Sequence, residues 1–202
     1  MRVGVLASGA GTNLQAILDR VHGREGVEVV AVGSDVPGAE ALARAERAGV
    51  PVRAFPVESF DDRAARDEAM GAWLEERGVD LLVLAGYMRL LTPAFLARFP
   101  QRVINVHPAL LPAFPGVRAI EQALAYGVKV TGVTVHFVDE GVDSGPIIFQ
   151  RALELRPGAD AAEVREALRP IEHELLCEAV RRFGRGAVRI DPADPRRVQV
   201  AG

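Results

Sequence analysis

Three side chains suited to acid–base chemistry, Asn105, His107 and Asp143, lie within the stretch from residue 103 to residue 146. Asn105 and His107 stand two positions apart at the end of a predicted buried strand, residues 102–106. Alternate residues of a strand point to the same side, so the amide and the imidazole share one face. Asp143 opens a Ser-Gly-Pro turn at the far end of the stretch. An amide donor, an imidazole and a carboxylate could therefore converge.

These three groups together could move a one-carbon acyl group onto an amine. Attack of an amine on a formyl carbon creates an oxyanion that needs hydrogen-bond donors, and protons must pass between the two nitrogens. The amide of Asn105 can donate, and an imidazole transfers protons near neutral pH. A carboxylate beside His107, such as Asp143, would favour its imidazolium form. The chain has no serine-centred nucleophile elbow and Cys177 has no catalytic signature, which favours direct transfer without a covalent enzyme intermediate.

Taken singly, each of these residues also has a structural interpretation. A lone histidine before a proline is more often structural than catalytic, and Asp143 could simply cap its turn. His136 is expected to complete the polar face of its strand. His107, His136 and Asp143 could bind a metal in principle, but no close ligand spacing supports this, so we expect no metal.

The composition predicts one globular domain spanning residues 1–202. The chain has 202 residues, of which 49% are hydrophobic, and a net charge of −3. Nothing in this balance calls for nucleic acid or a membrane surface as a partner. The apolar runs are strand-length, the N-terminus lacks a signal-peptide core, and there is one cysteine. We therefore expect a cytoplasmic protein that acts on small molecules.

Strands and helices alternate through the first half of the chain. This pattern predicts an α/β, Rossmann-like, doubly wound and mostly parallel sheet with ligands at the carboxyl ends of its strands. We assign residues 1–100 to a phosphate-binding half and residues 101–202 to a catalytic and ligand-binding half. The predicted strands are residues 2–7, 27–33, 50–55, 80–85 and 102–106, and the predicted helices are residues 14–21, 39–48, 61–77, a segment starting at 92–93, and 120–125.

The later part of the chain predicts an antiparallel C-terminal edge. Residues 129–138 alternate strictly and indicate a half-buried edge strand whose partner is residues 146–155. A long helix over residues 159–183 could kink or split at Pro170. Short apolar segments near the C-terminus favour a terminal hairpin. In the helix over residues 61–77, the predicted buried face carries Ala65, Ala69, Trp73 and Leu74.

A glycine-rich turn, residues 8–13, follows the first strand and precedes a helix. Strand, glycine turn and helix together favour phosphate binding, because free N–H groups face the anion. Leu14 stands where a dinucleotide fingerprint has its third glycine, so a phosphate monoester fits better than a pyrophosphate. A tight turn with Thr12 or Asn13 as helix N-cap explains the loop equally well. Asp35 would contact a ribose in a nicotinamide site, but a turn or cap role is the better interpretation.

The segment after the fourth strand and the start of the helix over residues 61–77 offer a second ligand site. Met88, Leu90 and Leu91 come just beyond a strand end, where apolar side chains can line a pocket for a flat ring. Core packing explains the same residues. Arg63 lies in the first turn of its helix, an unusual place for a cation. It is either an exposed surface residue or a contact to an anionic ligand.

Four sequence blocks resemble the phosphoribosylglycinamide formyltransferases, a branch of the folate-dependent formyltransferase family. The similarity covers nearly the whole chain, and the third and fourth blocks are specific in combination. The resemblance implies the formyltransferase fold and transfer of formyl from 10-formyltetrahydrofolate to the amine of glycinamide ribonucleotide, a step of purine biosynthesis. The blocks are VLASGAGTNLQAILD, LLVLAGYMRLLTPAFL, INVHPALLPAFPG and GVTVHFVDEGVDSGPII.

The resemblance also implies roles for particular residues. His107 would be the proton donor, Asn105 the oxyanion donor and folate contact, and Asp143 the carboxylate that acts on the histidine. The ribonucleotide would contact Gly11, Thr12, Asn13 and Glu172. The folate would contact Arg63, Met88, Arg89, Leu90 and Leu91, and the loop from Val138 to Asp143 would face its pteridine.

Some positions differ from those of certain relatives. Certain relatives carry serine where this chain has Thr12 and Ala109, and histidine near Arg118. Whether Arg118 or His136 assists the reaction stays open, and so does whether the protein is a monomer or a homodimer.

Four alternative functions have different requirements. Methionyl-tRNA formyltransferase would need a basic extra domain after the catalytic one, and formyltetrahydrofolate hydrolase an extra N-terminal domain before the strand that begins at Arg2. A nicotinamide-dependent oxidoreductase is favoured only by Gly9, Gly11 and Asp35. A non-catalytic nucleotide sensor would leave the three central side chains unexplained as a group.

Overall fold

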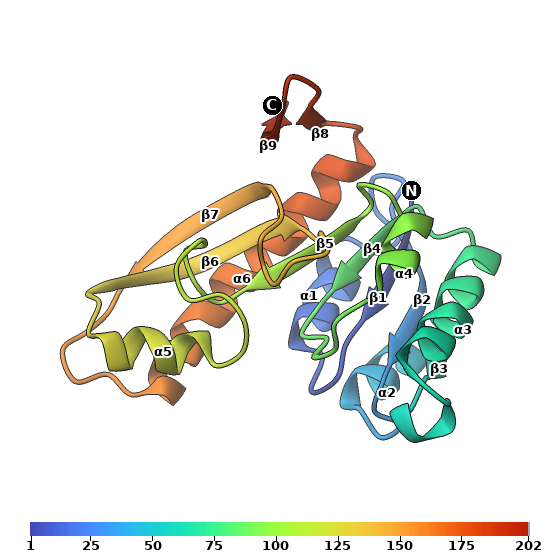
Figure 1. The fold of residues 1–202 in the computed structure, drawn as a ribbon, viewed down its shortest axis with the longest axis horizontal. Helices are drawn as coiled ribbons and strands as arrows, with labels where there is room; N and C mark the ends of the chain where they lie inside the picture. The colour runs from blue at the N-terminus through green and yellow to red at the C-terminus, as the bar shows by residue number, and fades with distance from the viewer. Residues whose placement is uncertain (202) are drawn as a thin grey trace.

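A seven-stranded sheet lies between two layers of helices in the computed structural model, which describes residues 1–201 (Figure 1). Five strands run parallel, and two antiparallel strands complete one side. The order β3-β2-β1-β4-β5-β6-β7 confirms the predicted doubly wound architecture. The strands are β1 (Arg2–Leu6), β2 (Glu28–Ser34), β3 (Val52–Ala54), β4 (Leu81–Leu84), β5 (Val103–His107), β6 (Val130–Phe137) and β7 (Ile147–Glu154).

Two hydrophobic clusters, one on each face of the sheet, hold the helices in place. The larger cluster joins the sheet to α1 (Thr12–Arg20), α2 (Glu40–Arg47), α5 (Ala119–Tyr126) and α6 (Ala161–Gly184). The smaller cluster joins the other face to α3 (Arg63–Glu76) and α4 (Pro93–Arg98). Neighbouring strand residues alternate between the clusters, because successive side chains of a strand point to opposite faces.

The strand order places three loops beside one another. From β1, the strands β2 and β3 are added on one side, and β4 and β5 are then added on the other side of β1. The direction in which strands are added therefore reverses between β1 and β4. In open parallel sheets, ligands bind at such a reversal, outside the carboxyl ends of the strands. The loops that follow β1, β4 and β5 meet there, and these are the loops that carry the candidate residues.

The sequence suggested that β6 is an edge strand, but the edge strand is β7, and both faces of β6 are covered. Thr134 and His136, which lie on the polar face of the predicted half-buried strand, are 0% and 1% exposed. The Thr134 hydroxyl accepts a hydrogen bond from the Leu111 N–H and donates one to the Ala109 carbonyl. The loop after β5 therefore covers the polar face of β6 and satisfies its hydroxyl group.

The helices also differ in detail from the predictions. In α3 the predicted core residue Ala65 is exposed, and the ion pair between Arg66 and Asp67 is buried in its place. The helix α6 continues through Pro170 without interruption. A short 3-10 helix, η1 (Val57–Ser59), precedes α3, and the predicted terminal hairpin forms from β8 (Val188–Asp191) and β9 (Asp194–Val200).

Gly11 is the residue before α1, where the sequence suggested Thr12 or Asn13. Its φ angle of 69° is left-handed, which favours glycine. A Cβ at this position would stand 2.7 Å from both the Cα and the Cβ of Ala41 in α2. A glycine at position 11 is therefore needed for the turn and for close packing of α1 on α2, whatever the loop binds.

We expect Gly11→Ala to lower the free energy of unfolding by about 2–4 kcal/mol. The new side chain would be strained in the left-handed backbone conformation and would also clash with Ala41. Urea denaturation measures this. Gly9→Ala is the matched control, because a Cβ at Gly9 would have no described atom within 4 Å; its effect should stay within about 0.5 kcal/mol. Equal stability of the two variants would contradict the packing role of Gly11.

Candidate active site

The register of β5 between its two neighbours brings the central polar residues together. Asn105 pairs with Leu84 of the parallel strand β4 on one side and with His136 of the antiparallel strand β6 on the other. His107 pairs with Thr134. An imidazole therefore lies directly beside the Asn105 amide, which the sequence alone did not predict.

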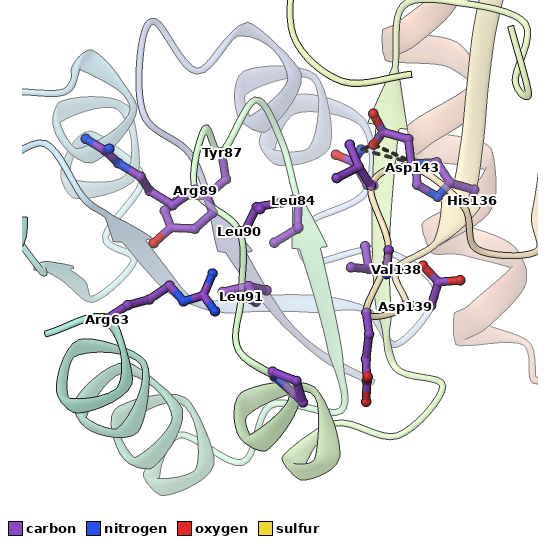
Figure 2. A pocket seen from close by; sticks show the side chains of 15 residues that line it. Arg63, Leu84, Tyr87, Arg89, Leu90, Leu91, His136, Val138, Asp139 and Asp143 are labelled. Atoms are coloured by element: carbon purple, nitrogen blue, oxygen red, sulfur yellow. Dashed lines mark hydrogen bonds and ion pairs between the residues drawn. The ribbon is translucent and has the colours of Figure 1, made fainter. Parts of the chain in front are cut away.

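Asp143 reaches this cluster from the loop after β6 and contacts both histidines. Its Oδ2 lies 3.3 Å from His107 Nδ1 and accepts a 2.7 Å hydrogen bond from the Gly116 N–H. Its Oδ1 accepts a hydrogen bond from Asn105 Nδ2 at 3.3 Å and lies 3.6 Å from His136 Nε2. The three predicted side chains thus converge, with His136 as a fourth member. Figure 2 shows Asp143 and His136 together beside the pocket.

The surroundings of Asp143 stabilise its charged form. Burial acts to raise the pKa of this carboxyl, but the contact with His136, the Gly116 N–H and the nearby His107 outweigh it, so that the pKa is lowered. The backbone of Asp143 is left-handed, with φ 51°. Such a conformation in a residue other than glycine costs about 1–3 kcal/mol and persists where surrounding contacts hold it, often at functional sites.

His107 is buried beneath the loop that follows β5. Its side chain is 6% exposed, and its Nε2 lies 2.8 Å from the Phe114 carbonyl oxygen. The carbonyl can only accept, so Nε2 carries the proton of this hydrogen bond. His107 does not line the neighbouring pocket, whereas Asn105, His136 and Asp143 do.

The pocket beside the cluster has a volume of about 260 Å³ and is lined by both apolar and polar side chains. One wall is the segment after β4 together with the start of α3, and the other is the loop after β6 (Figure 2). Of the predicted folate contacts, Arg63, Arg89, Leu90 and Leu91 line it together with Asn105, but Met88 does not. The other lining residues are Leu84, Tyr87, Pro93, His136, Val138, Asp139, Glu140, Gly141, Val142 and Asp143.

Tyr87 is a pocket residue to which sequence reasoning gave no role. Burial raises its pKa to about 12, so its hydroxyl stays neutral. That hydroxyl contacts the Met70 sulfur at 3.9 Å, which leaves the ring as the wall of the pocket. Its position just beyond the end of a strand could have identified Tyr87 as a pocket residue, as it did for Leu90 and Leu91.

The glycine-rich loop and α6 meet although they are far apart in sequence. Asn13 Nδ2 donates a 3.0 Å hydrogen bond to Glu172 Oε2, so two of the predicted ribonucleotide residues are in contact. The Asn13 side chain is buried, and its Oδ1 has no hydrogen-bond partner within residues 1–201. Burial raises the pKa of Glu172 despite the Asn13 hydrogen bond. Gly11 and Thr12 begin α1 beside this pair.

Asp35 is neither a helix cap nor available for a ribose. Its Oδ1 accepts a 2.5 Å hydrogen bond from the Ser8 hydroxyl, and its Oδ2 pairs with Arg89 Nε at 2.8 Å. Both carboxylate oxygens are thus engaged by protein groups, which removes the main support for a nicotinamide site.

A search of residues 1–201 finds no group of three or more His, Cys, Asp or Glu side chains arranged to hold a metal ion. Within the same residues, no helix is long and apolar enough to cross a membrane.

The geometry defines a group-transfer enzyme in which acid–base side chains border a ligand pocket at the sheet's reversal point. The sequence model of the formyl transferase family matches residues 1–180. The chain belongs to this family, which confirms the resemblance seen in the sequence.

Individual relatives agree with this assignment. The chain is 46% identical over 179 residues to the phosphoribosylglycinamide formyltransferase of Mycobacterium tuberculosis, covering 89% of this chain and 83% of that protein. It is 40% identical over 194 residues to the trifunctional purine biosynthetic protein adenosine-3 of Gallus gallus, covering 96% of this chain but only 19% of that protein. The crystal structure of glycinamide ribonucleotide transformylase 1 from Symbiobacterium toebii superposes with a TM-score of 0.94 at 47% identity, covering 100% of this chain and 94% of the other.

We expect Glu172→Gln to raise the melting temperature near neutral pH. Because the folded-state pKa of Glu172 is raised, ionisation favours the unfolded state, and the wild type loses stability as pH rises above the ordinary glutamate value. Glutamine can still accept the Asn13 hydrogen bond. Thermal unfolding at about pH 7.5 and about pH 4 tests this, and the gain should disappear at the lower pH.

Glu174→Gln is the matched control on the same helix. The hydrogen bond from Arg151 lowers the pKa of Glu174, so its stabilising effect is present above the ordinary glutamate value and lost as pH falls. This variant should be slightly less stable than wild type near neutral pH. The same sign of change in both variants would show that burial of Glu172 is not the cause.

Proposed function

We propose that this protein transfers the formyl group of 10-formyltetrahydrofolate to the primary amine of glycinamide ribonucleotide, giving formylglycinamide ribonucleotide in de novo purine biosynthesis. The observation that carries the proposal is the convergence of Asn105, His107 and Asp143 beside a pocket with both apolar and polar walls. The names of the relatives support the same reaction. We place the protein in the cytoplasm, where its small-molecule substrates would be used.

His107 is the proposed proton donor of the reaction. Both of its ring nitrogens face oxygen acceptors, Asp143 Oδ2 and the Phe114 carbonyl, an arrangement suited to the doubly protonated imidazolium. Attack by the amine forms a new C–N bond and moves the carbonyl electrons onto oxygen. The C–N bond to the folate nitrogen then breaks, and that nitrogen gains a proton while the amine loses one. For His107 Nε2 to take part, a substrate atom must replace the Phe114 carbonyl as its acceptor.

Asn105 is the proposed donor to the oxyanion. Its Nδ2 donates a hydrogen bond to Asp143 Oδ1 at 3.3 Å and lies 3.2 Å from His136 Nε2. One of these contacts must be exchanged for the oxyanion during transfer. His136 Nδ1 lies 2.8 Å from the Phe137 carbonyl oxygen, and its Nε2 lies beside both the Asn105 amide and Asp143 Oδ1. His136 therefore orients the amide and is a positioning residue in this proposal.

The two substrates would approach from different strand ends. Backbone N–H groups and the hydroxyl at Gly11, Thr12 and Asn13 would hold the ribonucleotide phosphate, and Glu172 would hold its ribose or amine portion. The folate would occupy the pocket between Arg63, Arg89–Leu91 and the loop from Val138 to Asp143. Met88 would contribute through its backbone. Residues 1–100 thus supply the phosphate site and one folate wall, and residues 101–202 supply the catalytic side chains.

Hydrolysis of formyltetrahydrofolate is the second candidate, because the same three groups could activate water. The contact between Asn13 and Glu172 favours transfer, since a hydrolase has no need of a second substrate site next to the phosphate loop. The discriminating measurement is folate turnover with and without glycinamide ribonucleotide. Turnover that depends on the ribonucleotide supports transfer, and equal turnover without it indicates the hydrolase.

We expect His107→Ala and Asp143→Asn each to reduce kcat by ~10²–10⁴-fold, because each removes part of the proton-transfer system. Steady-state formation of tetrahydrofolate in the presence of the ribonucleotide measures this. His22→Ala is the control for loss of a histidine, since His22 Nδ1 only accepts a hydrogen bond from the Val29 N–H. Near-normal turnover in both catalytic-site variants would refute the mechanism.

We also expect glycinamide ribonucleotide at ~100-fold its Kd to stabilise the protein by about 2.7 kcal/mol, as any ligand specific for the folded state does. Inorganic phosphate should give a smaller increase in melting temperature. Thr12→Ala removes a hydroxyl from the proposed phosphate site and should reduce both increases. Gln15→Ala, one turn further along α1, should leave them unchanged. An unaltered melting curve for wild type at high ligand concentration would exclude the site.

A further inference from the structure

The carboxylate of Asp35, at the end of β2, is buried and takes no part in the proposed chemistry. Asp35 is 5% exposed, and both oxygens have partners from other segments. The Ser8 hydroxyl, beyond the end of β1, donates to Oδ1 at 2.5 Å. Arg89, in the segment after β4, donates to Oδ2 from Nε at 2.8 Å. One carboxylate thus joins the two loops that we assign to different substrates.

Ser8 closes this network with a second set of contacts. Its hydroxyl oxygen accepts a 2.9 Å hydrogen bond from the Met88 N–H, and its own N–H donates to the Gly86 carbonyl at 3.0 Å. The first residue of the glycine-rich loop is therefore held by the segment Gly86–Arg89 and by Asp35 together. A shift of either loop would break contacts made by the other.

The network holds the negative charge of Asp35 at a buried position, where the charged form of a carboxyl group is energetically unfavourable. Burial acts to raise the pKa of Asp35, but the hydrogen bonds from Ser8 and Arg89 outweigh it and the pKa is lowered. Asp35 therefore remains a carboxylate. Only the carboxylate of this pair is buried, because the Arg89 side chain is 50% exposed. Burying a charged group costs solvation free energy, so a role in specifying geometry is a reasonable explanation for retaining Asp35.

We propose that Asp35 is a positioning residue that couples the two substrate loops, so that binding of either substrate strengthens binding of the other. This inference rests on the proposed function. When one substrate tightens its loop, the Ser8–Asp35–Arg89 network restricts the remaining motion of the other loop as well, so the second substrate meets a lower entropic cost. Such coupling is reciprocal, and the same factor applies whichever substrate binds first.

Isothermal titration calorimetry with full-length protein tests the proposal. The affinity for glycinamide ribonucleotide is measured alone and with saturating tetrahydrofolate, the product that cannot transfer formyl. We expect the folate to strengthen ribonucleotide binding by about 5-fold or more in the wild type, the lower range of typical allosteric coupling. In Asp35→Asn the factor should fall close to 1, because the charged bond to Arg89 is lost.

Two further variants separate coupling from general loss of stability. Ser8→Ala retains the Asp35–Arg89 pair but removes the connection to Met88, and it should also abolish the coupling. Asp67→Asn is the matched control, because Asp67 is equally buried but its partners, Arg66 and the Thr92 N–H, do not belong to the glycine-rich loop. It should lower the melting temperature while the coupling persists. Asp35→Asn should raise KM for both substrates by ~5–10-fold and change kcat by less than ~3-fold.

The outcomes are distinguishable. No formyl transfer by the wild type would overturn the proposed function and the inference that rests on it. An active wild type with no coupling would overturn the inference alone. Coupling that survives in Asp35→Asn or in Ser8→Ala, or that is lost equally in Asp67→Asn, would do the same.

Discussion

The arrangement of the catalytic cluster depends on the desolvated carboxylate of Asp143. A carboxylate at this position is stable only with hydrogen-bond or charge partners, and this one has four partners from three segments. Asn105 and His107 come from β5, His136 from β6 and Gly116 from the loop after β5. The same contacts hold the left-handed turn at Asp143 and the loop that covers His107.

The position of β5 in the sheet explains why the cluster can form. It is the last parallel strand, and its outer neighbour β6 runs antiparallel. Loops from the parallel side supply the ligand walls at the strand ends, whereas the antiparallel partner places His136 directly opposite Asn105. The connection from β6 to β7 then folds back and brings Asp143 to the same point. If β6 and β7 were parallel, a long crossover connection would have to join them, and the short β6–β7 connection that carries Asp143 would be lost.

The fold and the three central residues were predictable because their signals are local. Apolar runs mark buried strands, and the two-residue spacing of Asn105 and His107 follows from strand geometry. The role of His136 depended on the register between β5 and β6, which the alternating sequence does not determine. Thr134 was predicted to face solvent because alternation indicates one polar face, but the loop after β5 covers that face. Such long-range contacts leave little trace in a single sequence.

Three carboxylates, Asp35, Asp143 and Glu172, lie beside the proposed substrate sites. Each is bound by groups distant in sequence. Two of the three are stabilised as anions and one is destabilised, so net stability does not explain why they occur together. What they share is position, since each holds a segment beside the proposed substrate sites. Ordered segments lower the entropic cost of placing two small substrates at reacting distance, and that cost is a large part of the barrier to a bimolecular transfer. These acidic groups are thus a means of preorganisation, and their energetic cost falls on folding instead of on catalysis.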